Sequence, residues 1–350
     1  MNFASDNCSG VHPLVMDALV QANTGHAASY GDDAIMDRVS ARFREVFEAP
    51  DAEVFLVATG SAANAVSLAT LVEPWHAIYC HQHSHIQADE CGAPEFYTSG
   101  ARLVGINSDD GKITPGQLEN AVKATPKGDV HTYQRGAVSL TNTTEAGTVY
   151  SCEELAAITA VARANTLPVH LDGARFANAV AHLGCSPAQA SWKSGVDVLS
   201  FGGTKNGLMG VEAVVLFNPK KAWELQLRRK RGGHLFSKHR FLSAQMDAYL
   251  GDDLWLKTAR AANLRAQQLS AGLNKIAGVK VTQSVQANIV FMQATRAQHR
   301  QAQAAGAKYS MAPYDTPMQG DADEILHARM VCSWSTTEQD VADMVAAFGG

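Results

Sequence analysis

Five residues of this 350-residue chain follow apolar runs, and their types are suited to holding a charged ligand. Lys205 follows one run and two glycines, Asp172 ends a second, and Gly60–Ser61 follows a third. His85 closes the histidine cluster at the end of a fourth. Such runs are typical of buried strands, and α/β sheets bind ligands beyond the carboxyl ends of their strands. Each residue therefore stands where such a sheet places its ligands.

Lys205 and Asp172 carry opposite charges that a single aromatic cofactor would use. A lysine at the mouth of the strands can be desolvated, which lowers its pKa and frees the amine for Schiff-base chemistry. An aspartate that ends a buried strand needs a cationic or hydrogen-bonding partner, such as the protonated ring nitrogen of pyridoxal phosphate. Arg175 is suited to a substrate carboxylate or to the ring oxygen. Taken singly, a solvated Lys205, a helix-capping Asp172 and a surface Arg175 are the plainer alternatives.

The Gly60–Ser61 turn and the histidine cluster supply the other parts of such a site. A helix that starts at the turn offers free N–H groups and the positive end of its dipole, which suit a phosphate. A plain strand–helix turn is the alternative. His81, His83 and His85 alternate as three zinc ligands on a strand would, but an imidazole also stacks flat on an aromatic ligand. We expect one functional histidine and no metal, and the four features together predict pyridoxal phosphate.

Alternating strands and helices are expected to position these residues. Short apolar runs predict strands at 53–58, 77–81, 102–106, 136–141, 168–172, 196–201 and 212–217. Periodicity and capping boxes predict helices at 13–21, 35–47, 62–71, 114–124, 151–164 and 186–193. The alternation is typical of α/β layers around a largely parallel sheet.

The chain changes character after Pro219, where a basic segment precedes several helices. Helices are expected at 239–250, 252–273, 296–305 and from about 337, and strands at 279–283, 287–292 and 328–333. Ser335 and Glu338 have the spacing of a capping pair for the last helix. We predict a large cofactor-binding α/β domain over residues 1–250, including an N-terminal arm, and a smaller α+β domain over residues 251–350.

Composition restricts the classes of function. Hydrophobic residues make up 46% and charged residues 18% of the chain, a balance typical of a globular protein. The net charge of −5 gives no reason to expect nucleic acid or an anionic membrane as a partner. No apolar run approaches a membrane span, and the first residues do not have the pattern of a signal peptide. The six scattered cysteines favour reduced thiols in the cytoplasm.

Nearly the whole chain resembles the low-specificity L-threonine aldolases, which belong with the β-eliminating lyases and have the aspartate-aminotransferase-like fold (fold type I). The combination of motifs is specific, although no single motif is. The motifs are Ser5–Asp6, Tyr30–Gly–Asp–Asp33, Thr59–Gly60–Ser61–x–x–Asn64, His85–x–x–x–x–Glu90–x–Gly92–Ala93, Asp172–Gly–Ala–Arg175, Gly202–Gly–Thr–Lys205 and Ala328–Arg–Met–Val–Cys–Ser–Trp334.

The resemblance implies how the cofactor is held. Lys205 would form the Schiff base, Asp172 would pair with the ring nitrogen, and His85 would stack on the ring. His83 is an alternative for the stacking position. The remaining cofactor contacts would come from Gly60, Ser61, Arg175 and Thr204, with Gly60 and Ser61 at the phosphate.

The resemblance also implies which residues meet the substrate. Arg175 and Arg329 would face the cofactor oxygen and the substrate carboxylate, with Ser5 and Tyr30 close by. Many members of the family have a second histidine at the position of Thr144. His131 is a candidate to replace it, although an exposed loop histidine is the alternative. The base for the hydroxyl proton needs a pKa near neutral, which favours His85 or a water that it holds.

The activity that the resemblance implies is the reversible cleavage of L-threonine, L-allo-threonine and related β-hydroxy-α-amino acids to glycine and an aldehyde. The alternatives are another fold type I enzyme (a β-eliminating lyase or an aminotransferase), a zinc hydrolase built on the histidine cluster, and a binding protein without activity. The expected partners are a small amino acid and further copies of the chain, as a dimer or tetramer with the active site between subunits.

Overall fold

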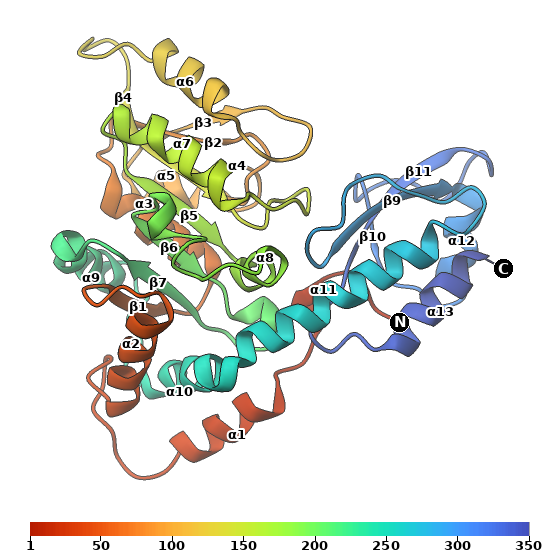
Figure 1. Ribbon diagram of the computed structural model, residues 1–350, viewed down its shortest axis with the longest axis horizontal. Helices are drawn as coiled ribbons and strands as arrows, with labels where there is room; N and C mark the ends of the chain where they lie inside the picture. The colour runs from red at the N-terminus through yellow and green to blue at the C-terminus, as the bar shows by residue number, and fades with distance from the viewer. Residues whose placement is uncertain (350) are drawn as a thin grey trace.

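The computed structural model describes residues 1–349 and contains two β-sheets of unequal size (Figure 1). Gly350, at the end of the predicted small domain, lies outside the described residues. The strands of the larger sheet, in the order β1-β7-β6-β5-β4-β2-β3, are β1 (Glu53–Val57), β2 (His76–His81), β3 (Arg102–Ile106), β4 (Gln134–Thr141), β5 (Val169–Gly173), β6 (Val198–Phe201) and β7 (Glu212–Leu216). Strand β7 is antiparallel to both its neighbours and the other pairs are parallel. The prediction of a mostly parallel sheet is confirmed.

Two layers of helices cover this sheet, because successive side chains of a strand point to opposite faces. In β1, Leu56 joins one hydrophobic cluster while Phe55 and Val57 join another. The first cluster includes residues of α2 (Ala34–Val46), α6 (Pro115–Ala124), α7 (Cys152–Ala164), α8 (Phe176–Leu183) and α10 (Arg240–Leu250). The second includes residues of α3 (Gly60–Leu71), α5 (Ala93–Tyr97) and α9 (Ala222–Arg231).

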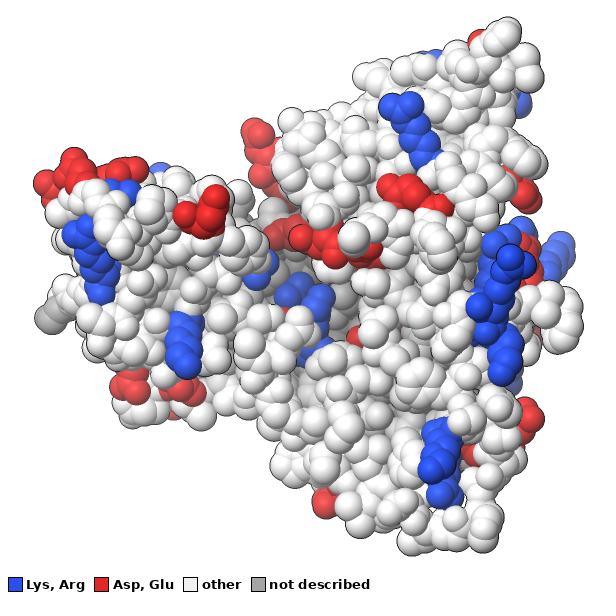
Figure 2. All heavy atoms as spheres, turned by 180° about the vertical axis from the view of Figure 1, so that it is seen from behind, with Lys and Arg blue, Asp and Glu red and all other residues white. Residues whose placement is uncertain are grey.

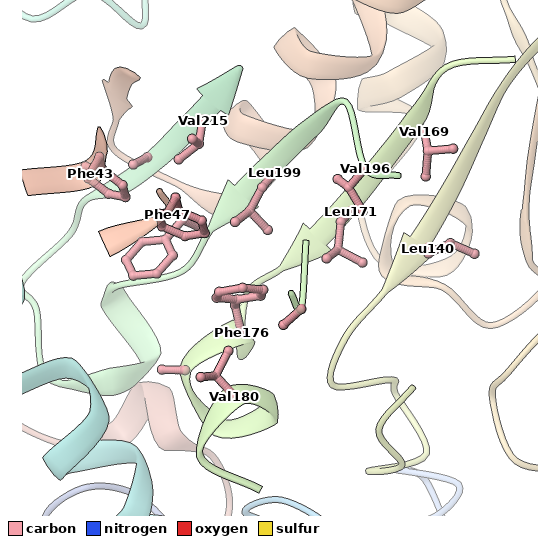
Figure 3. Packing of buried hydrophobic residues seen from close by; sticks show 14 of the residues in the cluster. Phe43, Phe47, Leu140, Val169, Leu171, Phe176, Val180, Val196, Leu199 and Val215 are labelled. Carbon is pink, nitrogen blue, oxygen red and sulfur yellow. The ribbon is translucent and has the colours of Figure 1, made fainter. Parts of the chain in front are cut away.

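Aromatic rings fill the first cluster beneath the carboxyl ends of the central strands. Phe47 stacks on Phe43 and on Phe176, with ring centroids 5.9 and 5.8 Å apart (Figure 3). Phe201, the last residue of β6, meets the edge of Phe43 at 5.2 Å. Buried aromatic pairs in these geometries stabilise a core beyond the area that they bury. The packing of these rings therefore holds the strand ends that carry the candidate site.

The smaller sheet is antiparallel and has the order β10-β11-β9-β8. Its strands are β8 (Lys280–Val281), β9 (Ile289–Thr295), β10 (Ser310–Met311) and β11 (Ile325–Val331). It packs with α11 (Leu254–Leu273), α12 (Arg296–Ala304) and α13 (Glu338–Gly349). Helix α11 also contacts α8, so it links the two parts of the molecule (Figure 1). Phe3 is buried in the core of the smaller part, so the start of the chain joins it.

One helix prediction is wrong. Residues 186–193 form turns, followed by a 3-10 turn at Trp192–Ser194. Hydroxyls explain this, because Ser191 and Ser194 donate to the carbonyls of Pro187 and Gln189 at 2.6 and 2.5 Å and so compete with helical bonding. Helix α8 lies earlier in the chain, between the helices expected at 151–164 and 186–193. The last helix is capped by Thr337 and Asp340, which bond reciprocally, and not by the predicted pair Ser335 and Glu338.

Helix α1 (Pro13–Ala22) and the short helix α4 (His85–Ala88) complete the parts that concern the site. The capping boxes predicted at Thr114 and Ser151 are both present. Within residues 1–349, every helix is too short or too polar to cross a membrane.

Candidate active site

The carboxyl ends of β5 and β6 bring Asp172 and Lys205 to one pocket. The two strands are parallel neighbours, with Asp172 paired to Ser200 in register, and Lys205 lies in the short turn Thr204–Asn206 beyond β6. Figure 2 shows the surface from behind, hollowed between the two lobes, with acidic and basic side chains in the hollow. The pocket is lined by Gly60, Asn64, His85, Thr141, Thr143, Glu145, Asp172, Ala174, Arg175 and Lys205.

Two glycines allow the chain to turn tightly before Lys205. A Cβ on Gly202 would collide with the carbonyl of Ala174, and one on Gly203 would collide with Leu208 and lie 2.6 Å from the carbonyl of Val211. Only glycine permits such close approach of backbone. The N–H of Gly203 donates to the buried carboxylate of Glu212 at 2.6 Å, which holds the turn in place.

Asp172 is a buried carboxylate held by two donors. Its Oδ2 accepts from the amide of Asn64 at 2.9 Å and its Oδ1 accepts from the backbone N–H of Ala174 at 3.0 Å. Only 3% of Asp172 is exposed. Each oxygen has room for a further donor, since a carboxylate accepts about four hydrogen bonds. Asp172 is therefore oriented and remains able to take a proton-bearing ring nitrogen.

His85 begins α4 and is fixed at both its ring and its backbone. Its Nδ1 lies 2.8 Å from Oε1 of Glu90, whose side chain is fully buried, and its backbone N–H donates to Oε1 of Glu145 at 2.7 Å. The hydrogen bond to Glu90 raises the pKa of His85, and the charge of Asp172 adds to this effect. The imidazole is thus held at the pocket in a fixed orientation.

Lys205 and Arg175 are two cations of the same pocket with different surroundings. Burial lowers the pKa of the Lys205 amine, and the charge of Arg175 lowers it further. Arg175 is held by Asp6, which accepts from Nε at 2.7 Å and from the second guanidinium nitrogen at 2.9 Å. Asn288 donates to the same carboxylate at 3.0 Å. Arg175 therefore stays charged while the amine of Lys205 is more easily neutral, as a nucleophile requires.

The pocket fits pyridoxal phosphate on three observations. Helix α3 opens at Gly60, where no atom lies within 4 Å of a built Cβ, and Thr59 caps it by accepting from Ala62. Its first N–H groups are therefore free for a phosphate. Within residues 1–349, buried polar atoms of Asn64 and Thr143 have no partner. A cofactor that brings hydrogen-bonding groups to the pocket would satisfy them.

Other predicted residues lie beside this pocket or away from it. Ser61 follows Gly60 on α3 and Thr204 precedes Lys205, so both adjoin the lining residues. The hydroxyl of Ser5 accepts from the N–H of Asn7 and so helps to place Asp6. Arg329 lies in a separate hollow with Tyr314, its guanidinium 5.8 Å from the ring.

Tyr30, His83 and His131 are not brought to the pocket within one chain. Tyr30 is 46% exposed and lines a different hollow, with the amine of Lys230 4.6 Å from its ring. His83 is exposed and contacts Gln82, and His131 is exposed in a loop. Within residues 1–349, no three metal-ligating side chains gather as a candidate metal site. The geometry therefore gives no support to a zinc site built on the histidine cluster.

The sequence profile of the β-eliminating lyases matches residues 2–295 of the chain. The chain belongs to the β-eliminating lyase family. A low specificity L-threonine aldolase of Pseudomonas sp. (strain NCIMB 10558) is 41% identical over 98% of this chain and 96% of that protein. One of Pseudomonas aeruginosa is 42% identical over 98% of this chain and 95% of that protein.

Solved structures agree with this family. The threonine aldolase of Leishmania major superposes with a TM-score of 0.91 at 26% identity and covers 99% of this chain and 98% of its own. The serine palmitoyltransferase of Sphingomonas wittichii, with a TM-score of 0.70 at 17% identity, covers 100% of this chain and 86% of its own and shares the fold alone. The predicted resemblance and fold class are confirmed.

Four contributions to the site are absent from the sequence prediction. Thr143 and Glu145 line the pocket, Asp6 holds Arg175, and Glu212 holds the turn at Gly203. Glu145 follows Thr144, the position where the family's second histidine was expected, yet the side chain of Thr144 bonds to Thr148 at 2.7 Å and does not line the pocket. The sequence signal for Glu145 was its position directly after Thr144, in the same segment at the end of a strand. For Glu212 the signal was an acidic residue at the start of an otherwise apolar strand.

Proposed function

We propose that this chain cleaves L-threonine, L-allo-threonine and related β-hydroxy-α-amino acids reversibly to glycine and an aldehyde, as a pyridoxal phosphate-dependent lyase. The observation that carries the proposal is the meeting of Lys205 and Asp172 in one pocket beside the open start of α3. The Pseudomonas relatives named as threonine aldolases support it along nearly their whole length. Other chemistry on the same fold, β-elimination or amino transfer, is the alternative.

When bound, pyridoxal phosphate supplies the electron sink for the pair released from the broken Cα–Cβ bond. In this proposal Lys205 would hold the cofactor covalently through its amine. Asp172 would accept the ring N–H, and His85 would lie against the ring. The contacts assigned to the rest of the cofactor are Gly60 and Ser61 at the phosphate, Arg175 at the ring oxygen, and Thr204.

The substrate carboxylate is assigned to Arg175 and Arg329, with Ser5 and Tyr30 near it. Fixing the carboxylate would restrict the substrate to few orientations in the pocket, which lowers the entropic cost of reaction. Tyr30 is exposed and lies at another hollow of its own chain. We therefore assign it to the site of a neighbouring copy, so that the protein is a dimer or tetramer with shared active sites. His83 and His131 stay as alternative candidates without a contact to the pocket.

The deciding experiment is to incubate the purified protein with pyridoxal phosphate and L-threonine, then L-allo-threonine, and to measure glycine and acetaldehyde. Equal amounts of glycine and acetaldehyde are expected. Ammonia and a keto acid without glycine would instead indicate β-elimination or amino transfer. A protein that does not take up pyridoxal phosphate would contradict the proposal altogether.

Two further expectations, the domain boundary and the cellular location, belong to the same proposal. We assign residues 1–250 to a large cofactor-binding domain and residues 251–350 to a small one, which limited proteolysis near residue 250 would test. We assign the enzyme to the cytoplasm because its described cysteines are all free thiols. Cell fractionation would test that location.

A further inference from the structure

Glu145 is a carboxylate of the pocket that no role above uses. It lies in the connection between β4 and α7, where Thr144 turns its hydroxyl to Thr148 and leaves Glu145 to line the pocket. It faces the same space as Lys205, Asp172 and Arg175. A carboxylate in this place has to have a partner or a proton, because an unpaired buried charge is costly.

The two oxygens of Glu145 have different surroundings. Oε1 accepts the backbone N–H of His85 at 2.7 Å, which fixes the carboxylate against the start of α4. Oε2 is buried and has no hydrogen-bond partner in the described part of the chain. Since Oε1 is occupied by a donor, a proton on this carboxyl group resides on Oε2. Oε2 is therefore the atom that can exchange a proton with a bound molecule.

Burial and a neighbouring charge bring the pKa of Glu145 close to neutral pH. Burial and the charge of Asp172 raise the pKa of Glu145 from 4.5 to about 7, while hydrogen bonds to backbone N–H groups act in the opposite direction. A general base works best when its pKa lies near the working pH. The titratable or charged groups that face Glu145 are His85 on α4, Asp172 on β5, Arg175 beyond β5, Lys205 beyond β6, Cys80 on β2 and Tyr150 before α7.

His85 is less suited to the same task. Its Nδ1 is bound to the carboxylate of Glu90, and that bond raises the pKa of His85. Because the carboxylate of Glu90 can only accept, Nδ1 carries the hydrogen of this bond and is not available as a base. A flat ring that stacks on the cofactor also presents its face, not a lone pair, to that cofactor.

We propose that Glu145 is the base that takes the proton of the substrate β-hydroxyl, through Oε2, as the Cα–Cβ bond breaks. The O–H bond is replaced by an H–Oε2 bond, and the electron pair that it leaves becomes the second bond of the aldehyde carbonyl. The pair of the Cα–Cβ bond passes to the electron sink described above. It then forms a C–H bond at Cα with one proton from the pocket, so the numbers of protons and electrons balance. This inference rests on the proposed threonine cleavage.

The test replaces Glu145 by glutamine, which keeps an oxygen for the N–H of His85 but cannot take the proton. With holoenzyme, we expect kcat for L-threonine to fall by about 10²-fold or more, the usual contribution of a general base. Exchange of the glycine α-proton with deuterated solvent, followed by NMR, requires no hydroxyl proton and should keep the parental rate. Glu119→Gln, at an exposed site on α6, is the matched control and should change neither rate.

A second variant and a direct titration separate this role from a structural one. Glu145→Ala should regain threonine cleavage when formate is added, because formate supplies the missing carboxylate. Infrared spectra of the full chain without cofactor should contain a protonated-carboxyl band that titrates near pH 7 and is absent from Glu145→Gln. Parental threonine cleavage by Glu145→Gln, or loss of glycine exchange together with cleavage, would overturn the inference. If the parent itself does not cleave threonine, the proposed function fails first.

Discussion

Lys205 depends on its neighbours for the reactivity that its position suggests. Burial and the nearby guanidinium of Arg175 both lower the pKa of its amine, whereas Asp6, Asp172 and Glu212 oppose them. Arg175 is itself compensated by Asp6 in a two-pronged ion pair, a geometry that is stronger than a single hydrogen bond. The chain therefore keeps one cation permanently charged beside another that can lose its proton.

Lys205→Ala should keep the fold but lose the covalent link to the cofactor. Borohydride treatment of the parent should fix the cofactor on the peptide that contains Lys205, and no peptide of the variant should carry it. Threonine cleavage should fall by more than about 10²-fold, since the covalent attachment of the cofactor is gone. Lys220→Ala, at an exposed position, is the control. Parental activity in Lys205→Ala would show that the anchor lies elsewhere.

The raised pKa of Glu145 also makes the stability of the cofactor-free chain depend on pH. Between pH 4.5 and about 7 the unfolded chain loses this proton while the folded chain keeps it, so stability falls as pH rises. At about 1.4 kcal/mol per pKa unit, the effect is at most about 3 kcal/mol and is complete above pH 7. Glu145→Gln should remove it, so the variant should gain stability relative to the parent from pH 5 to pH 8. Urea unfolding at both pH values measures this, and an unchanged difference would contradict it.

Among the secondary-structure elements, the turns that follow the strands form the site. The assignment of the phosphate to the first turn of α3 is the simplest to test. Gly60→Ala puts a methyl group where the structure has open space, so the cofactor-free chain should fold as before. If the phosphate lies there, the Kd for pyridoxal phosphate should rise by about tenfold or more, which corresponds to about 1.4 kcal/mol. Gly116→Ala, in the first turn of α6, has equally open space and should leave the affinity unchanged.

Most elements of the large sheet could be predicted because each strand contains a short run of apolar residues. The ends of β5 and β6 also placed Asp172 and Lys205 correctly in relation to one another. Other features depend on contacts between distant segments. The bond between Thr144 and Thr148 leaves Glu145, and not Thr144, to line the pocket. Hydrophobic periodicity does not predict such a turn.

The arrangement of the histidines could not be read from their spacing. His85 lines the pocket and His83 does not, because the chain leaves β2 at His81 and starts α4 at His85. The alternation that suggested three ligands on a strand therefore ends at His81. Helix α8, with the sequence Phe–Ala–Asn–Ala–Val–Ala–His–Leu, is only eight residues long and is absent from the predicted helices.

At the scale of the whole molecule, large apolar side chains are exposed around α5 and α9. Phe96 is 80% exposed, Trp223 68% and Leu227 52%, and Phe96 and Leu227 line the same groove. Exposed apolar groups that gather in this way mark protein interfaces. Tyr30, the predicted substrate contact that lies away from the pocket, is held against Lys230 of α9. Helix α9 therefore contributes both to the groove and to the contact with the residue that we assign to a neighbouring active site.

Leu227→Glu should separate the copies, because it places a charge in the groove that the proposed interface buries. Light scattering after gel filtration should give the mass of a single chain for the variant and a multiple of it for the parent. Threonine cleavage should fall with the dissociation if the partner subunit's Tyr30 completes each site. Leu264→Glu is the matched control, since Leu264 is also exposed, at 49%, but lies on α11. If Leu227→Glu keeps the parental mass, the interface lies elsewhere. If single chains are fully active, Tyr30 of a neighbouring copy is not part of the active site.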